Sequence, residues 1–385
     1  MKTLKKILIR VLLLAALLVI MNYVYTTFFF ERDLKEHSEM IDLVREIPPD
    51  VDIIYVGESS NNNFRINDAD KRHISDFIAD HFPGITLYDI TEQASHAEVF
   101  EILLNQIPDT INPRVVVVTL NLRSFNAQWI YSDLETALQK RMVLLRDNPP
   151  LVNRFMLSFE AYDLKSEEEL VKQVRNKWRG DEFDFPYPFP HQNVEEWDKW
   201  MAATGVRDEN GNIDYEKTEL ACHYIKGFGF QIDTMSNPRI KNFNNIVELA
   251  GERGWQLVFN LMAENYEKAG KLVGDDLLFL LDQNRQLLVN YYERRGVRVV
   301  DNLFDLADEE FTDQYWTTEH YGERGRKMIA GNVARTLKAF FPEAYSEPVY
   351  AGKHRTKFFN DCENNDSWGQ VQTITSEVSY LGMNS

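Results

Sequence analysis

The chain has 385 residues, of which 44% are hydrophobic and 26% are charged, a composition that favours a folded globular protein over a disordered one. Its net charge of -18 argues against nucleic acid as a partner. Proteins that bind polyanions carry basic stripes, whereas lysine and arginine are scattered here among more numerous acidic residues.

The amino end predicts a membrane anchor over residues 1–30. Basic residues between Lys2 and Arg10 precede an apolar run at residues 11–21, and aromatic residues continue it to Phe30. Roughly 20 helical residues cover a hydrocarbon core of about 30 Å. No small-x-small cleavage site follows the run, so we favour an uncleaved anchor over a cleaved signal peptide. Either way, we expect the body to be exported across a bacterial plasma membrane, with the basic end in the cytoplasm.

A connector over residues 31–50 leads into alternating strand and helix patterns. We predict strands at residues 52–56, 85–90, 114–120, 255–260 and 297–301, and helices at residues 66–81, 96–107, 238–253, 275–295 and 322–340. Short β-branched strands that alternate with helices are typical of buried parallel sheets. Residues 51–341 are therefore expected to form a three-layer α/β domain with a doubly wound, mainly parallel five-stranded sheet.

The third and fourth strands are too far apart for one crossover helix, so we predict a large helical insertion at about residues 126–236. An aromatic and proline-rich stretch at residues 183–190 either caps a site or packs the insertion onto the core, and the second interpretation is favoured. Residues 342–385 are expected to form a peripheral tail. Cys222 in the insertion and Cys362 in the tail can pair in an oxidising compartment, and their pairing is left open.

An acidic loop at residues 208–219 has the ligand spacing of an EF-hand calcium site. Ile213 stands where that loop needs glycine, and Asn210 with Gly211 is a common hairpin signal. We therefore expect a plain turn, and neither a metal nor a cofactor in the protein.

The first strand runs into Gly57, Glu58 and Ser59, a tight turn that presents a hydroxyl at the carboxyl end of the sheet. A catalytic serine needs a histidine within hydrogen-bond distance. His320 lies in the loop after the fifth strand, and a doubly wound sheet brings that loop to the same edge. A Gly-x-Ser turn is often only a helix cap. The shared position of Ser59 and His320 favours catalysis.

Asn121 ends the third strand, where its amide either donates to a developing oxyanion or caps the loop. The turn after the second strand, which contains Ser95, offers a backbone N–H to the same position. We assign Asn121, Gly57 and Ser95 to oxyanion and substrate binding.

These segments resemble the SGNH, or GDSL-like, hydrolases. The first block of that superfamily reads Gly-Asp-Ser, to which Gly57-Glu58-Ser59 is similar, and later blocks carry an asparagine and a histidine that match Asn121 and His320. The resemblance covers residues 50–125 and 255–340 and implies an SGNH or flavodoxin-like fold with serine esterase chemistry.

The chain departs from the pattern of the superfamily at two points. Members usually carry aspartate three residues before the histidine, or two before it in the membrane-anchored alginate O-acetyltransferase branch, and Thr317 and Thr318 stand there. Asp313, Glu319 or a backbone carbonyl is left to orient His320, and Asp313 is favoured because adjacent side chains diverge. The glycine of the second block is replaced by Ala94 or Ser95, a gap that is compatible with a weak or inactive enzyme.

An exported, anchored member of this group resembles proteins that acylate or deacylate surface glycans. The resemblance implies a membrane-anchored serine esterase or O-acyltransferase that acts on acyl esters of a cell-envelope polysaccharide, with a membrane acyltransferase as a possible partner. The alternative is a weak or inactive scaffold that binds glycan or such a partner. A phosphate-binding α/β protein is a third option, but the chain lacks the lysine and glycines of a P-loop.

Overall fold

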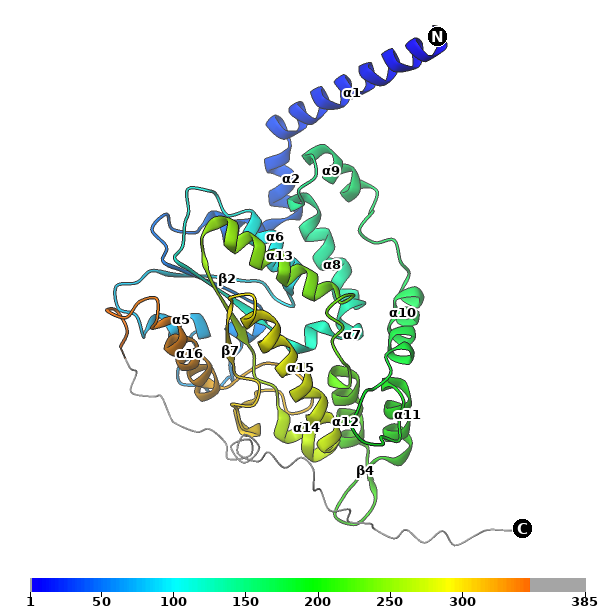
Figure 1. The fold of residues 1–385 in the computed structure, drawn as a ribbon, viewed down its shortest axis with the longest axis vertical. Helices are drawn as coiled ribbons and strands as arrows, with labels where there is room; N and C mark the ends of the chain where they lie inside the picture. Colours follow the sequence, from blue (N-terminus) through cyan, green and yellow to red (C-terminus); the bar gives the residue numbers. More distant parts are fainter. Residues whose placement is uncertain (1, 347–385) are drawn as a thin grey trace, which may run out of the picture. The chain divides into compact units, whose positions relative to one another are not determined.

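The computed structural model describes residues 2–346 (Figure 1). Its main sheet has five parallel strands in the order β2-β1-β3-β6-β7. The strands are β1 (Ile53–Gly57), β2 (Leu87–Thr91), β3 (Val115–Leu120), β6 (Gln256–Leu261) and β7 (Arg298–Asp301). All five predicted strands are confirmed, with ends that differ from the prediction by at most two residues. The order is doubly wound, and it reverses between β1 and β3, where open α/β sheets form a crevice.

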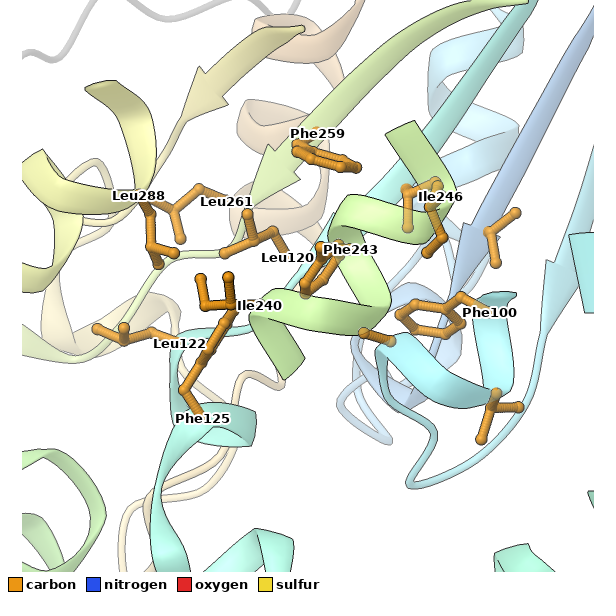
Figure 2. Close-up of a cluster of buried hydrophobic side chains, with 14 of the residues drawn as sticks. Phe100, Leu120, Leu122, Phe125, Ile240, Phe243, Ile246, Phe259, Leu261 and Leu288 are labelled. Carbon is orange, nitrogen blue, oxygen red and sulfur yellow. The ribbon is translucent and has the colours of Figure 1, made fainter. Parts of the chain in front are cut away.

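The sheet is buried on both faces, because successive side chains of a strand point to opposite sides. In β1, Ile54 and Val56 belong to one core, whereas Ile53 and Tyr55 belong to the other. The helices that cover the first core are α6 (Ala97–Asn105), α13 (Pro238–Arg253) and α15 (Asp275–Glu293), and those that cover the second are α5 (Ile74–Ala79) and α16 (Glu323–Leu337). Figure 2 shows Phe243 of α13 packed between Phe125 and Phe259 in the first core. The predicted three-layer architecture is confirmed.

One predicted helix is shorter than expected, because α5 begins at Ile74 and not near residue 66. The residues before it use their side chains to bond the backbone. Asp68 accepts from the Arg65 N–H at 2.9 Å, and Asp70 accepts from the Arg72 N–H at 3.2 Å. Short acidic side chains that bond nearby N–H groups compete with the helix, and here they stabilise a loop.

The segment between β3 and α13 is largely helical. It contains η2 (Leu122–Phe125), α7 (Ala127–Ile130), α8 (Asp133–Met142), η3 (Val143–Leu145), α9 (Pro150–Ser158), α10 (Glu167–Gly180), α11 (Val194–Thr204) and α12 (Tyr215–Phe228). The aromatic stretch packs onto α15, with the rings of Phe185 and Phe279 5.3 Å apart, which agrees with its favoured interpretation. The short strands β4 (Val206–Arg207) and β5 (Ile213–Asp214) pair around Gly211, which has a φ of 82°. The acidic loop is thus a hairpin turn.

The amino end forms one long helix, α1 (Lys2–Phe28). Residues Thr3–Phe28 are long and apolar enough to cross a membrane, a property that a signal sequence shares. The connector folds as α2 (Phe30–His37), η1 (Glu39–Ile41) and α3 (Asp42–Arg45), and the remaining short helices are α4 (Ser59–Asn62), α14 (Tyr266–Leu272) and η4 (Asp308–Glu310). Cys222 is buried in α12, whereas Cys362 and most of the expected tail lie outside the described residues.

Candidate active site

The strand register places four polar side chains at the carboxyl edge of the sheet. Val56 of β1 is paired with Val118 of β3, so Ser59 and Asn121 each lie three residues beyond a matched pair. The next pair of strands repeats this arrangement. Leu120 is paired with Leu261, so Arg123 and Glu264 each lie three residues beyond. Strand pairing therefore brings together residues that are far apart in the chain.

Gly57 allows β1 to turn tightly into Ser59. A Cβ at this position would lie 2.8 Å from the Tyr55 ring and 3.2 Å from Thr119 Oγ1. Both of these side chains are fully buried and cannot move away, so a residue larger than glycine does not fit at position 57. Its carbonyl accepts from the Glu92 N–H at 3.2 Å, which ties the turn to the loop after β2.

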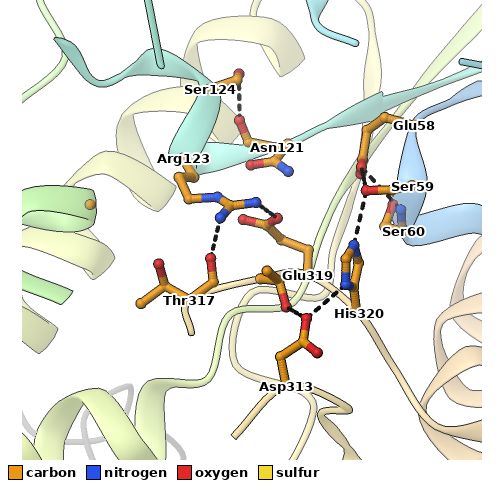
Figure 3. A network of polar contacts seen from close by, with 12 residues as sticks. Glu58, Ser59, Ser60, Asn121, Arg123, Ser124, Asp313, Thr317, Glu319 and His320 are labelled. Carbon is orange, nitrogen blue, oxygen red and sulfur yellow. Dashed lines mark hydrogen bonds and ion pairs between the residues drawn. The ribbon is translucent and has the colours of Figure 1, made fainter. Parts of the chain in front are cut away.

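Ser59, His320 and Asp313 form a continuous hydrogen-bonded chain (Figure 3). His320 Nε2 lies 3.0 Å from Ser59 Oγ, and His320 Nδ1 lies 2.8 Å from Asp313 Oδ2. The Thr318 hydroxyl donates to the same oxygen of Asp313. The structure thus brings together the three residues that the sequence suggested as nucleophile, base and orienting acid, and Asp313 lies seven residues before the histidine.

Asn63 fixes the environment of the histidine further. Its Nδ2 lies 2.9 Å from His320 Nε2 and donates to the Ser59 carbonyl at 2.9 Å. When Asp313 accepts the Nδ1 proton, Nε2 keeps one lone pair, for which the serine hydroxyl and the asparagine amide compete. This tautomer is the one in which a histidine can act as a base toward Ser59.

Glu58 approaches the nucleophile from the other side. Its Oε2 lies 2.9 Å from Ser59 Oγ and accepts from the Ser60 N–H at 3.0 Å. Burial, and then repulsion from Glu319, raises the pKa of the Glu58 carboxyl. The Ser59 hydroxyl has two acceptors within reach, Glu58 Oε2 at 2.9 Å and His320 Nε2 at 3.0 Å.

Behind the serine lies a buried acidic cluster, which consists of Glu58, Glu264 and Glu319 and is closed by Arg123. Arg123 Nη2 lies 2.6 Å from Glu319 Oε2, and Arg123 also donates to the Thr317 carbonyl. Burial, repulsion from Glu319 and a hydrogen bond to Glu319 raise the pKa of Glu264 well above its ordinary value. Because Glu319 is paired with Arg123, its side chain points away from Asp313, although Glu319 is adjacent to His320 in the chain (Figure 3).

The raised pKa of Glu264 predicts a pH-dependent stability that Glu264→Gln removes. An unfolded Glu264 ionises near its ordinary pKa of 4.5, whereas the folded protein holds the proton to higher pH. Between these two pKa values the folded state binds more protons, so its stability falls as the pH rises. We expect the wild type to lose about 1.4 kcal/mol per pH unit in this window relative to the variant.

Urea unfolding followed by tryptophan fluorescence, from about pH 5 to about pH 8, measures this difference. The exposed Glu309→Gln variant is the control and should keep the wild-type slope. Parallel curves for Glu264→Gln and the wild type would contradict a raised pKa.

The residues suggested for oxyanion binding differ in the hydrogen bonds that they already make within the fold. Asn121 lies at the sheet edge, and its buried Oδ1 has no hydrogen-bond partner within the described residues. Ser95 is buried, its N–H donates to the Glu92 carbonyl at 3.4 Å and its hydroxyl to the Gly57 carbonyl at 3.4 Å. Ala94 has a φ of 55°, a backbone conformation that glycine adopts more easily. Both hydrogen-bond donors of Ser95 are thus used within the fold, whereas no hydrogen bond from the Asn121 side-chain amide occurs within the described residues.

The insertion forms a wall beside this site. Helix α12 contacts the loop that carries His320, with the rings of His223 and Trp316 4.0 Å apart. A small hollow of about 130 Å³ opens there, and Trp129 and Arg123 also line it. The insertion therefore packs onto the core through its aromatic stretch and borders the site through α12.

The sequence did not identify Asn63, Arg123 or Glu264 as members of the site. Each has a signal in retrospect, since Arg123 and Glu264 are each the third residue after a buried strand and Asn63 closes the turn after Ser59. Charged residues just after buried parallel strands are the pattern that could have found two of them.

The comparisons with known proteins give little further information. No family model matches the sequence, and no curated protein matches it. Among solved structures, the chain is similar to a lipase/acylhydrolase from Enterococcus faecalis, with a TM-score of 0.34 and 8% sequence identity over 75% of this chain and 97% of that chain. A similarity this distant carries no information about activity.

Proposed function

We propose that the protein is an exported, membrane-anchored serine esterase or O-acyltransferase. The observation that supports this proposal is the continuous chain from Ser59 Oγ through His320 to Asp313 Oδ2, with hydrogen-bond distances of 3.0 and 2.8 Å. A serine, a histidine and a carboxylate in this order form the arrangement that activates a hydroxyl for attack on an acyl carbon.

In the proposed mechanism, Ser59 Oγ attacks the carbonyl carbon of an ester while His320 Nε2 takes the hydroxyl proton. In this proposal Asp313 stabilises the imidazolium, and Asn121 donates to the oxyanion. The intermediate collapses, the alcohol leaves with the proton from His320, and the acyl group remains on Ser59. Water or a sugar hydroxyl then gives its proton to His320 and attacks the acyl carbon. The bond from that carbon to Ser59 Oγ breaks, and Ser59 recovers its proton from His320. The product is a free acid in the first case and a new ester in the second.

The proposed substrate is an acyl ester of a cell-envelope polysaccharide. Helix α1 is suited to anchor the body at the outer side of a plasma membrane, with its basic end in the cytoplasm. An anchored enzyme acts on material at that surface and can receive acyl groups from a membrane acyltransferase. The hollow beside the site has aromatic walls, which suit the apolar faces of sugar rings.

Trapping the acyl-enzyme tests this proposal. The protein is mixed with p-nitrophenyl acetate and quenched, and intact mass spectrometry is expected to show the gain of one acetyl group, which peptide mapping assigns to Ser59. Adding an oligosaccharide acceptor distinguishes the two reactions, because transfer yields acetylated sugar and hydrolysis yields only acetate. Absence of an acyl-enzyme, together with absence of turnover, would favour the scaffold alternative.

Asp313→Asn is expected to lower kcat/KM for ester cleavage by roughly 10²- to 10⁴-fold, with the main effect on kcat. The asparagine amide is neutral, so it does not stabilise the positive charge that forms on His320 when the histidine takes the serine proton. Proton transfer from Ser59 therefore becomes less favourable. Steady-state kinetics measure the loss. Glu309→Gln removes a charge from a neighbouring, exposed position and should leave kcat/KM near the wild-type value. Equal activity of Asp313→Asn and the wild type would indicate a Ser-His dyad.

A further inference from the structure

Helix α9 carries an apolar stripe on its solvent side. Val152, Phe155 and Phe159, the last at the carboxyl cap, are 44%, 41% and 76% exposed. Their spacing of three and four residues places them on one side of the helix, whereas Asn153 and Leu157 are buried on the other. The rings of Phe155 and Phe159 stack with centroids 6.3 Å apart. This helix is amphipathic, and its apolar side has no cover within the described residues.

The same helix is hydrogen-bonded to α1, the candidate membrane span. The Leu151 N–H donates to Asn22 Oδ1 of α1 at 2.9 Å. A second connection runs through Asp33 of α2, which is buried. Asp33 Oδ2 accepts from the Tyr25 hydroxyl at 3.0 Å and lies 2.6 Å from Arg154 Nε of α9. Figure 1 shows α9 beside the junction of α1 and α2.

These contacts determine the depth at which α9 lies relative to a bilayer that α1 crosses. Asn22 and Tyr25 lie inside the 26-residue apolar segment Thr3–Phe28. Such a helix is about 39 Å long, whereas the hydrocarbon core is about 30 Å thick, so its last turns reach into the headgroup layer. Asn22 lies about 9 Å along the axis from Phe28, and α9 begins beside Asn22.

From this continuity we infer that α9 lies in the headgroup layer of the membrane that α1 crosses, with Val152, Phe155 and Phe159 toward the acyl chains. The occupant of the apolar stripe is therefore lipid. The inference rests on the membrane anchoring in the proposed function and is independent of catalysis. In this arrangement α9 is bonded to both α1 and α2 and lies on the bilayer. These contacts hold the folded body in one orientation relative to the membrane.

Depth-dependent quenching in vesicles tests this inference with the full chain. In a Cys222→Ser, Cys362→Ser background, a single cysteine replaces Phe159 and carries an environment-sensitive fluorophore. The protein is reconstituted into vesicles of phosphatidylcholine and phosphatidylglycerol that contain nitroxide-labelled lipids. Leu14→Cys in α1 reports whether the span is inserted. Tyr215→Cys, 79% exposed and next to the hairpin at the other end of the body in Figure 1, is the matched control.

We expect lipid nitroxides to quench the probes at positions 14 and 159, with quenching at 159 at least about twofold stronger than at 215. Quenching at 14 without excess quenching at 159 would overturn the inference and leave the anchor intact. Absence of quenching at 14 would overturn both. Val152→Cys repeats the measurement at the other end of the stripe, so the result does not depend on one labelled variant.

Discussion

Ser59→Ala is expected to abolish labelling by a fluorophosphonate probe and to lower kcat/KM for ester cleavage by about 10³-fold or more. The methyl group cannot form the acyl-enzyme, and the remaining groups can only bind substrate and polarise its carbonyl. The loss should appear in kcat. Because Ser59 is only half-buried and its neighbours are otherwise unchanged, we expect the thermal midpoint to stay close to that of the wild type.

The adjacent Ser60 offers a matched control. It is fully buried, and its hydroxyl has no hydrogen-bond partner within the described residues. Ser60→Ala keeps the turn and the backbone N–H that donates to Glu58, so it should retain labelling and activity. Equal labelling of the wild type and Ser59→Ala, or loss of labelling in Ser60→Ala alone, would contradict the role proposed for Ser59.

Arg123→Met is expected to destabilise the protein by about 3–5 kcal/mol. The Arg123 side chain is 9% exposed and its partner Glu319 only 1%, so the substitution leaves a carboxylate in the core without its counter-charge. The apolar stem of arginine is retained by methionine, which restricts the change mainly to the lost charge and hydrogen bonds. Urea unfolding followed by tryptophan fluorescence measures the loss.

Two further variants make this result specific. Arg72→Met removes two ion pairs, to Asp70 and Asp80, in which the arginine is 46% exposed, and each exposed pair contributes about 0–1 kcal/mol. Arg123→Met combined with Glu319→Gln removes the stranded charge and should recover part of the lost stability. A loss for Arg123→Met no larger than that for Arg72→Met would contradict a stabilising role of the buried Arg123–Glu319 ion pair.

The sequence was sufficient to predict the parallel sheet and the position of Ser59 and His320 at one edge of it. The β-branched runs before Gly57 and Asn121 are typical of buried strands, and parallel strands place their carboxyl ends at one edge. That rule brings Ser59 and His320 to one edge of the sheet. The helix predicted from residue 66 was too long, because the acidic side chains of that segment bond the backbone in a way that a hydrophobic pattern does not reveal.

The tertiary structure decided which acid faces the histidine. From the sequence, Asp313, Glu319 or a carbonyl could orient His320, and only adjacency argued against Glu319. In the fold, Arg123 pairs with Glu319, which is 196 residues away, and His320 Nδ1 contacts Asp313, which lies seven residues earlier in the chain. A local pattern cannot specify an ion pair between distant segments, because the energy of that pair depends on burial and geometry that arise only when the strands are paired.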